Sequence, residues 1–298
     1  MSATTSPSAM APGPAPSGGG RTLRHALGTV FIWALIVVIM IWTLFPFYWA
    51  FINSIRDAKY SYGNLWLPVV QFPVTLAHWQ KQWSYPELRQ ALLNSTIIAI
   101  AAATLAVVLG SLAAYGIARF RYHRPSNGSL TSWFLSQRIA PPVIFVAPFF
   151  LILRQFGLID TLLGLIILNA TFNLPFPVII LTQMFRDIPR ELEEAAQIDG
   201  ASRWEMFSRI ALPLVAPGIV VSWILCLAFS WNEFLFAYAT TVKNRPMSVF
   251  LVGAEQTRGV DYQYVGTRTL MALIVPLIAA LLVQRYIVRG LSLGAVKG

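Results

Sequence analysis

The chain has 298 residues, of which 56% are hydrophobic and only 11% are charged, and its mean hydropathy is +0.63. Soluble domains carry about 25% charged residues, so a chain this apolar cannot cover its surface with polar groups. This composition excludes an ordinary soluble protein and predicts an all-α integral membrane protein. The net charge of +10 would favour nucleic-acid binding in a soluble protein. Here the basic residues flank apolar segments, so membrane topology explains them better and no nucleic-acid partner is expected.

The N-terminal residues 1–20 are rich in Ala, Pro, Ser and Gly and predict a disordered tail, followed by one membrane domain over 21–298. The apolar segment 27–52 is too long for a signal peptide and lacks a small-residue cleavage site, so we expect a retained helix. Cys226 is the only cysteine, which excludes a disulfide within the chain. The three histidines show no ligand spacing, so no metal or cofactor is expected in this chain.

Six segments reach the roughly 20 apolar residues that a spanning helix needs. They are 27–52, 92–117, 132–154, 162–184, 214–238 and 268–289. Arginines follow the second and fourth segments and lie near both termini. The positive-inside rule therefore predicts that both termini and the even-numbered connections are cytoplasmic.

Small residues recur every four positions along the second segment and predict close helix packing inside one bundle. They are Ala102, Ala106, Gly110, Ala114 and Ala118. Prolines interrupt the next two segments, at Pro141, Pro142 and Pro148 and at Pro175 and Pro177. Broken helices at membrane depth are tolerated beside a watery cavity, so these prolines favour a transport pathway.

The long outer connections 53–91 and 239–267 are rich in Trp and Tyr. These aromatic side chains fit either anchoring at the membrane interface or docking of an external partner.

The cytoplasmic loop 187–213 predicts two short amphipathic helices joined at Gly200. Pro189 suits the first turn of the first helix. The apolar face of this helix is expected to carry Ile188, Leu192, Ala195 and Ala196. In the second helix, Ser202 and Glu205 form a capping box, Trp204, Phe207 and Ile210 are the apolar positions, and Pro213 ends the helix.

Two readings of this loop differ in what covers it. An amphipathic helix can rest on lipid headgroups. Anionic headgroups would repel Glu191, Glu193 and Glu194, however, and small Ala195 and Ala196 beside carboxylates suit a protein groove better. The sequence therefore favours docking on a protein.

The spacing of the loop resembles the EAA signature of binding-protein-dependent importer permeases, which have the MetI-like fold of type I ABC importers. The matching residues are Glu194, Ala195, Ala196, Asp199, Gly200, Ala201, Ile210, Leu212 and Pro213. In that family this loop is the coupling helix that docks on the ATPase subunit, and the resemblance implies the same role here.

Shorter matches extend over most of the chain beyond the N-terminal tail. They include Asn94-Ser95, Gly157-Leu158 with Asp160-Thr161, Leu174-Pro175-Phe176, Trp231-Asn232-Glu233-Phe234 and the C-terminal Gly294–Gly298. These resemble the carbohydrate branch, specifically the six-span permease of maltose-type systems, and imply a sugar as cargo.

The resemblance implies an ATP-driven importer that works by alternating access in the bacterial cytoplasmic membrane. The chain has no G-x-x-x-x-G-K-[ST] phosphate loop, so ATP and Mg²⁺ are expected on partner subunits and not on this transport subunit. The implied partners are a second homologous permease, an ATPase dimer and an extracytoplasmic solute-binding protein.

Polar residues within the spans are candidates for the substrate pathway. Asn169 and Asn173 share one helical face, and either sugar contact or an interhelical hydrogen bond would satisfy their amides. For Trp231, Asn232 and Glu233 a structural or gating role is favoured over sugar contact. Arg138 is expected to extend to the membrane interface.

Three other functions remain open. The cargo could be a polyol or a glycerol-phosphate compound, which an arginine facing the pathway would favour. An ATP-independent secondary transporter would need inward-facing ionisable groups at mid-membrane, and the sequence has few. A membrane enzyme would need a catalytic set of residues, and none shows useful spacing.

Overall fold

The computed structural model describes residues 19–60, 66–252 and 261–295. Residues 1–49 and 50–298 form two units, and each is described by itself. The expected disordered tail lies outside the described residues except for Gly19 and Gly20, which begin α1 (Gly19–Ile55). The first unit contains most of α1, whose apolar portion Leu27–Ile55 has a mean hydropathy of 2.6 and bears apolar residues on all sides. A helix of this kind is stable only where lipid or other protein covers it.

In its described part, the regular secondary structure of the second unit is helical, apart from two isolated β-bridges. Its α-helices are α2 (Ala77–Ser84), α3 (Pro86–Arg119), α4 (Asn127–Ser136), α5 (Val146–Gln155), α6 (Leu162–Asn173), α7 (Pro175–Asp187), α8 (Arg190–Ile198), α9 (Arg203–Glu205), α10 (Leu212–Leu214), α11 (Ala216–Trp231), α12 (Leu235–Thr240), α13 (Met247–Val252) and α14 (Tyr262–Ala295). Short 3₁₀ segments occupy Ala58–Tyr60 and Pro142–Phe145, and a π-helical segment occupies Met206–Ala211.

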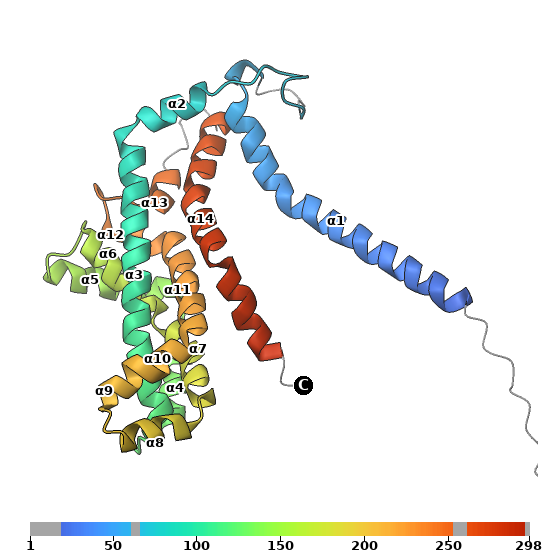
Figure 1. Ribbon diagram of the computed structural model, residues 1–298. Coiled ribbons are helices and arrows are strands. Elements are labelled where there is room, and N and C mark those ends of the chain that lie inside the picture. The colour runs from blue at the N-terminus through green and yellow to red at the C-terminus, as the bar shows by residue number, and fades with distance from the viewer. Residues whose placement is uncertain (1–18, 61–65, 253–260, 296–298) are drawn as a thin grey trace, which may run out of the picture. The chain divides into compact units, whose positions relative to one another are not determined.

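Helix α3 is the centre of the second unit and packs against α6, α7 and α11 (Figure 1). Its predicted stripe of small residues is buried at Ala102, Ala106, Gly110 and Ala114, which confirms packing inside one bundle. A Cβ atom at Gly110 would lie 2.5 Å from Pro177 Cγ, so only glycine permits this approach of α3 to α7. Close backbone contact of this kind lets membrane helices associate through van der Waals packing.

The predicted span 132–154 does not form one helix. Helix α4 ends at Ser136, a turn follows, and α5 begins only at Val146. Pro141 has extended backbone angles of φ −59° and ψ 127°, because a residue that precedes a proline is sterically kept out of the α region. The predicted interruption by prolines is therefore confirmed at Pro141 and Pro142. Pro148 lies in the first turn of α5, where its missing N–H costs little.

Two other predicted spans are bent. The segment 162–184 divides into α6 and α7, which meet at 44° at Leu174, and Pro175 is the first residue of α7. The segment 214–238 is not one helix either, because α11 ends at Trp231 and α12 begins at Leu235. Among the described residues three helices are long and apolar enough to cross a membrane, or five if each bent pair is one span. The chain is thus a multi-pass membrane protein, and the sixth span stays a prediction.

Candidate functional site

The loop predicted to couple to an ATPase begins with α8, which ends in a well-defined glycine cap. Gly200 has φ +86°, a left-handed conformation that other residues adopt only with strain. The N–H of Ala201 donates to the carbonyl of Ala196 at 2.9 Å, and that of Gly200 donates to Gln197 at 3.1 Å. These two bonds make a Schellman motif, so Gly200 turns the chain sharply after α8. The predicted hinge at Gly200 is confirmed.

The second half of the loop starts with the predicted capping box. Ser202 Oγ accepts the N–H of Glu205 at 3.3 Å, and the Glu205 carboxylate accepts the N–H of Ser202 at 3.0 Å. Helical structure continues through α9, the π-helical segment and α10 as far as Leu214. The expectation that Pro213 ends the helix is therefore wrong by one residue. The chain bends by 77° at Val215 before it enters α11.

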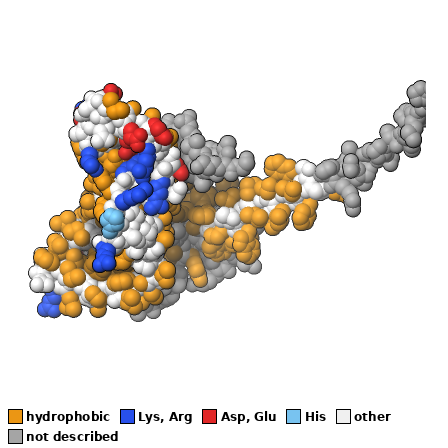
Figure 2. Space-filling model, turned by 90° about the horizontal axis from the view of Figure 1, so that it is seen from below, with side chains coloured by type: hydrophobic (Ala, Val, Ile, Leu, Met, Phe, Trp, Pro, Cys, Tyr) orange, Lys and Arg blue, Asp and Glu red, His pale blue; other side chains and the backbone are white. Residues whose placement is uncertain are grey.

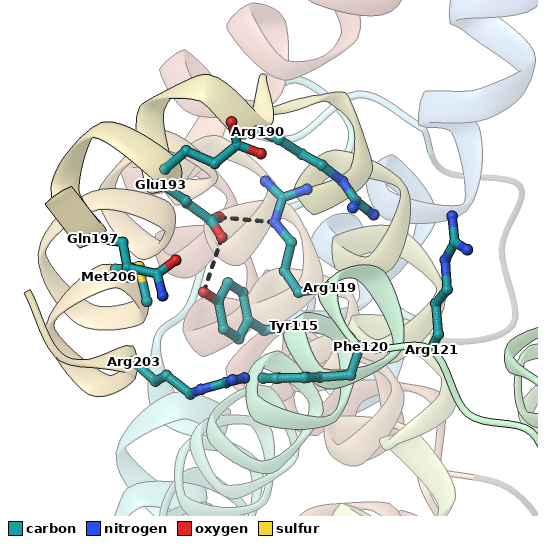
Figure 3. Close-up of a pocket in the computed structure, with 10 residues that line it drawn as sticks. Tyr115, Arg119, Phe120, Arg121, Arg190, Glu193, Gln197, Arg203 and Met206 are labelled. Carbon is teal, nitrogen blue, oxygen red and sulfur yellow. Dashed lines mark hydrogen bonds and ion pairs between the residues drawn. The ribbon is translucent and has the colours of Figure 1, made fainter.

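Helix α8 is held on the end of α3 by Glu193, a residue outside the matched signature. Arg119 Nε donates to Glu193 Oε1 at 2.8 Å, and Tyr115 Oη donates to Glu193 Oε2 at 3.2 Å (Figure 3). Arg119 also donates from Nη2 to the carbonyl of Ile188 at 3.1 Å. The spacing of Tyr115 and Arg119, four residues apart at the end of α3, was the available signal.

The apolar side chains of α8 project away from the bundle. Leu192 is 47% exposed and Ile198 is 88% exposed, and Ala195 is also exposed. Ile188 does not belong to this face as predicted, because it precedes α8 and is buried in the core with Phe185. Pro189 is likewise the N-cap residue and lies just before the first turn. The described part of the chain supplies no cover for this apolar face.

The second helix of the loop is anchored by an aromatic cluster. The rings of Phe207 and Tyr115 are 5.1 Å apart between centroids, and Tyr115 lies edge-on to Phe185 at 5.4 Å. Trp204, predicted as another apolar position, is 64% exposed. The loop is therefore joined to both α3 and α7 by packed rings.

The remaining matched residues divide between surface and core. Glu194, Asp199 and Pro213 are exposed, whereas Ile210 and Leu212 are half-buried against the bundle. Helices α8 and α9 lie at one end of the second unit (Figure 1). Figure 2 views this end and shows basic side chains beside acidic ones.

The candidate pathway residues on α6 are bonded within the bundle. Asn173 is 3% exposed, and its Nδ2 donates to Ser230 Oγ at 2.9 Å and to the Cys226 carbonyl at 3.3 Å. Asn169 Nδ2 donates to the Leu165 carbonyl at 2.9 Å. For Asn173 the interhelical hydrogen bond is therefore present in this conformation, and it joins α6 to α11. Sugar contact by either amide stays a prediction.

The three residues at the end of α11 have different environments. Trp231 is buried in the core between α3 and α11, and Asn232 is exposed. The Glu233 carboxylate accepts the N–H groups of Phe236 at 2.7 Å and Ala237 at 3.1 Å, so it caps the first turn of α12. These bonds fit a structural or gating role for Glu233, which the sequence favours over sugar contact.

Other matched residues fasten the segment that follows α12. The Asp160 carboxylate accepts the N–H groups of Val242, Lys243 and Asn244 at 2.9 to 3.1 Å. Burial raises the pKa of Asp160, but the three hydrogen bonds lower it by more than burial raises it. The net pKa of Asp160 therefore lies below its usual value. Similarly, Ser95 Oγ accepts the N–H of Met247 at 2.7 Å. Asp160 and Ser95 both belong to the matched motifs. Their hydrogen-bond partners lie up to 152 residues away in sequence and could not be predicted from it.

A cavity of about 530 Å³ lies where the third predicted span is broken. Its lining combines aromatic rings with amide and hydroxyl groups, from Trp133, Gln137, Phe145, Phe149, Thr171 and Phe172. Aromatic faces cover the C–H groups of a sugar, and amides and hydroxyls bind its hydroxyl groups, so this lining suits a neutral sugar.

Arg138 lies beside this break and does not extend freely to the interface as expected. Its guanidinium lies 4.2 Å from the ring centroid of Phe176 and 5.0 Å from that of Phe229, and Nη1 donates to the Phe172 carbonyl at 3.2 Å. The stacked rings of Phe176 and Phe229 stabilise the cation by cation–π attraction.

Known proteins similar to this chain are transport permeases. The family described as binding-protein-dependent transport system inner membrane component matches residues 106–293. The trehalose transport system permease protein SugB of Mycobacterium tuberculosis is 33% identical, with 89% of this chain and 97% of SugB aligned. The trehalose/maltose transport system permease protein MalG of Thermococcus litoralis is 32% identical over 88% and 94% of the two chains. The melibiose/raffinose/stachyose import permease protein MelC of Bacillus subtilis is 30% identical over 85% and 91%.

The same fold occurs in a chain of a bacterial ABC transporter that imports the acidic polysaccharide alginate. The TM-score is 0.75 at 21% identity, and the alignment covers 92% of this chain and all of that chain. The match confirms the predicted MetI-like helical arrangement. The family match covers more than half of the chain, including the whole of the loop 187–213. The chain belongs to the family of binding-protein-dependent transport system inner membrane components.

Proposed function

We propose that this chain is a transmembrane subunit of an ATP-driven, solute-binding-protein-dependent importer, and that its cargo is a sugar. The observation that carries the proposal is the geometry of α8. This helix is fixed to α3 by Glu193 on one side and presents Leu192 and Ile198 to the outside on the other. A surface of this kind suits a groove on a second protein, because exposed apolar side chains gain free energy when a partner covers them.

In this proposal the partner that covers α8 is an ATPase dimer, and this dimer supplies the ATP and Mg²⁺ sites. A conformational change in that dimer moves α8. The contacts of Glu193 with Arg119 and of Phe207 with Tyr115 and Phe185 pass the movement to α3 and α7. The loop biases alternating access only if it binds the ATPase differently in the two states. A second permease of the same fold and an extracytoplasmic solute-binding protein complete the assembly, with both termini of this six-span chain in the cytoplasm.

A neutral sugar is favoured over an anionic polyol phosphate. The relatives reported above are permeases for trehalose, maltose and melibiose. In addition, the cavity at the broken third span is lined by aromatic, amide and hydroxyl groups, and the guanidinium of nearby Arg138 is already engaged by two rings and a carbonyl. Whether the cargo occupies that cavity depends on the partner permease, which forms the other half of the pathway.

The test compares two exposed apolar residues at opposite ends of the second unit. Tagged full-length chain is purified from its native cells in mild detergent, and co-purifying proteins are identified by mass spectrometry. We expect an ATPase subunit with the unaltered chain and at least tenfold less with Ile198→Asp, because an unpaired charge in an interface costs several kcal/mol. Val70→Asp is the matched control, since Val70 is 80% exposed but lies in the outer connection.

Cargo is tested by uptake of labelled maltose, trehalose and glycerol 3-phosphate in cells with and without the chain. Uptake of a neutral disaccharide that requires both the chain and ATP supports the proposal. Recovery of the chain alone in several detergents, with uptake that persists after ATP depletion, would instead support a secondary transporter.

A further inference from the structure

A polar cavity of about 350 Å³ lies between the end of α3 and the inner side of α8 (Figure 3). Its charged lining residues are Arg119, Arg121, Arg190, Glu193, Glu194 and Arg203. Figure 3 shows the side chains of Arg119, Arg121 and Arg190 on the same side of the cavity. Four arginines in one small cavity repel each other unless negative charge balances them.

The protein balances only part of this charge. Glu193 is paired with Arg119 at 2.8 Å, which leaves Glu194 against the other three arginines. Arg203 lies over the ring of Phe120 at 4.9 Å. Within the described part of the chain no carboxylate forms an ion pair with Arg121, Arg190 or Arg203, as the two pairs found are Arg119–Glu193 and Arg209–Glu205.

A phosphate group fits this excess of positive charge. The planar guanidinium fork binds phosphate oxygens in pairs, and such charge-assisted bonds are about twice as strong as neutral ones. The cavity lies at the end of α3, a helix long enough to span the membrane, where basic pockets between helices meet anionic headgroups. A phosphate ester on a lipid and a free phosphate offer the same oxygens.

We propose that this cavity is a phosphate-binding site, filled by the phosphate of an anionic lipid headgroup or by a free phosphate. Residues 190, 193, 194 and 197 of α8 follow at i, i+3, i+4 and i+7, so they share the face that lines the cavity. Leu192 and Ile198 lie outside this set and are exposed. A bound phosphate therefore ties α8 to α3 and leaves the apolar side chains free for the ATPase.

Only the consequence for coupling depends on the proposed importer function. Binding itself depends on the cavity and is measured on the full-length chain without ATP, sugar or partners. A failure of phosphate binding and a failure of ATPase recruitment are therefore separate results.

The probes are phosphatidylglycerol, zwitterionic phosphatidylcholine and inorganic phosphate. Lipid adducts on delipidated full-length protein are counted by native mass spectrometry, and inorganic phosphate is followed by the shift in melting temperature. We expect phosphatidylglycerol to bind in preference to phosphatidylcholine. Arg121→Gln and Arg190→Gln should each weaken binding roughly fivefold, and the double variant roughly 25-fold.

Arg186→Gln is the matched control, because Arg186 is exposed at the same end and does not line the cavity. Both cavity arginines are exposed and form no ion pair among the described residues, so the single variants should fold even if the double variant does not.

The outcomes distinguish a lipid phosphate, a free phosphate and the absence of a phosphate site. Phosphatidylglycerol adducts that inorganic phosphate does not displace identify a lipid, whereas displacement together with a phosphate-dependent rise in melting temperature identifies free phosphate. Equal binding by wild type and cavity variants, or an equal loss in Arg186→Gln, would overturn the proposal.

Discussion

Arg119 and Glu193, 74 residues apart in sequence, meet through a 2.8 Å bond from Nε to Oε1 that joins the end of α3 to α8. Their side chains are only 8% and 13% exposed. Few waters compete for the bond, so it is worth more than a surface ion pair. It fixes the orientation of the loop relative to the bundle.

Removal of one member of this pair should therefore destabilise the protein and weaken coupling. Arg119→Gln or Glu193→Gln leaves a nearly buried charge without its partner, at a cost of about 3 kcal/mol. We expect a lower melting temperature in detergent and slower ATP-dependent uptake. The double variant Arg119→Gln/Glu193→Gln should recover much of the loss, because neither charge remains.

The control for this prediction is the exposed pair of the same loop. Arg209 lies 3.1 Å from Glu205, but the Arg209 side chain is 77% exposed. Arg209→Gln should cost no more than about 0.5 kcal/mol. Equal losses in Arg209→Gln and Arg119→Gln, or strict additivity in the double variant, would show that burial of the Arg119–Glu193 pair does not matter.

Gly200→Asp should leave the protein in the membrane but uncouple uptake from ATP. No atom lies within 4 Å of a Cβ built at Gly200, so the side chain fits, and Asp tolerates the left-handed conformation better than most residues. The new charge would project from the turn that presents α8 to its partner. The measurements are the amount of protein in the membrane fraction and ATP-dependent uptake.

Gly200→Asn is matched to this change in size and backbone preference and differs only in charge. It should retain more uptake than Gly200→Asp. Normal uptake with Gly200→Asp would refute the coupling role of the loop.

Gly110→Ala should lower stability because the added methyl group meets a rigid ring. Its Cβ would lie 2.5 Å from Pro177 Cγ and 2.8 Å from Pro177 Cβ, so α3 and α7 must separate. Overpacking of this kind costs about 1–3 kcal/mol. Gly116→Ala, on the same helix, meets only Tyr122 Oη at 3.4 Å and should be nearly neutral. Thermal unfolding in detergent measures both, and a neutral Gly110→Ala would contradict the close approach of the helices.

Asp160 should make stability depend on acid pH. Its folded pKa is lower than in the unfolded chain, so its contribution is fully present above the unfolded pKa of about 3.9 and is lost as pH falls through the folded pKa. Asp160→Asn keeps the left-handed backbone at φ 57° but carries no charge. We expect the variant to be less stable than wild type at pH 7 and the difference to shrink toward pH 3. A melting-temperature difference that is constant over this range would refute the role of the charge.

The sequence by itself determined the class of this protein, the extent of its apolar segments and the local structure of its loop. Composition required a lipid environment, while Ser202 with Glu205 and the glycine at position 200 specified caps that depend only on neighbouring residues. Prolines at 141 and 142 likewise announced the break in the third segment. Such features are readable because each is a property of a few consecutive residues.

Only the tertiary structure decided which groups lie together across long stretches of chain. Glu193 among three neighbouring glutamates, Asn173 opposite Ser230 and Asp160 opposite Val242 depend on how helices pack, and periodicity carries no information on such pairs. The end of α11 at Trp231 also escaped prediction, because hydropathy measures burial in lipid and not the continuity of the backbone. The cavity between α3 and α8 exists for the same physical reason: arginines far apart in sequence are brought together by folding alone.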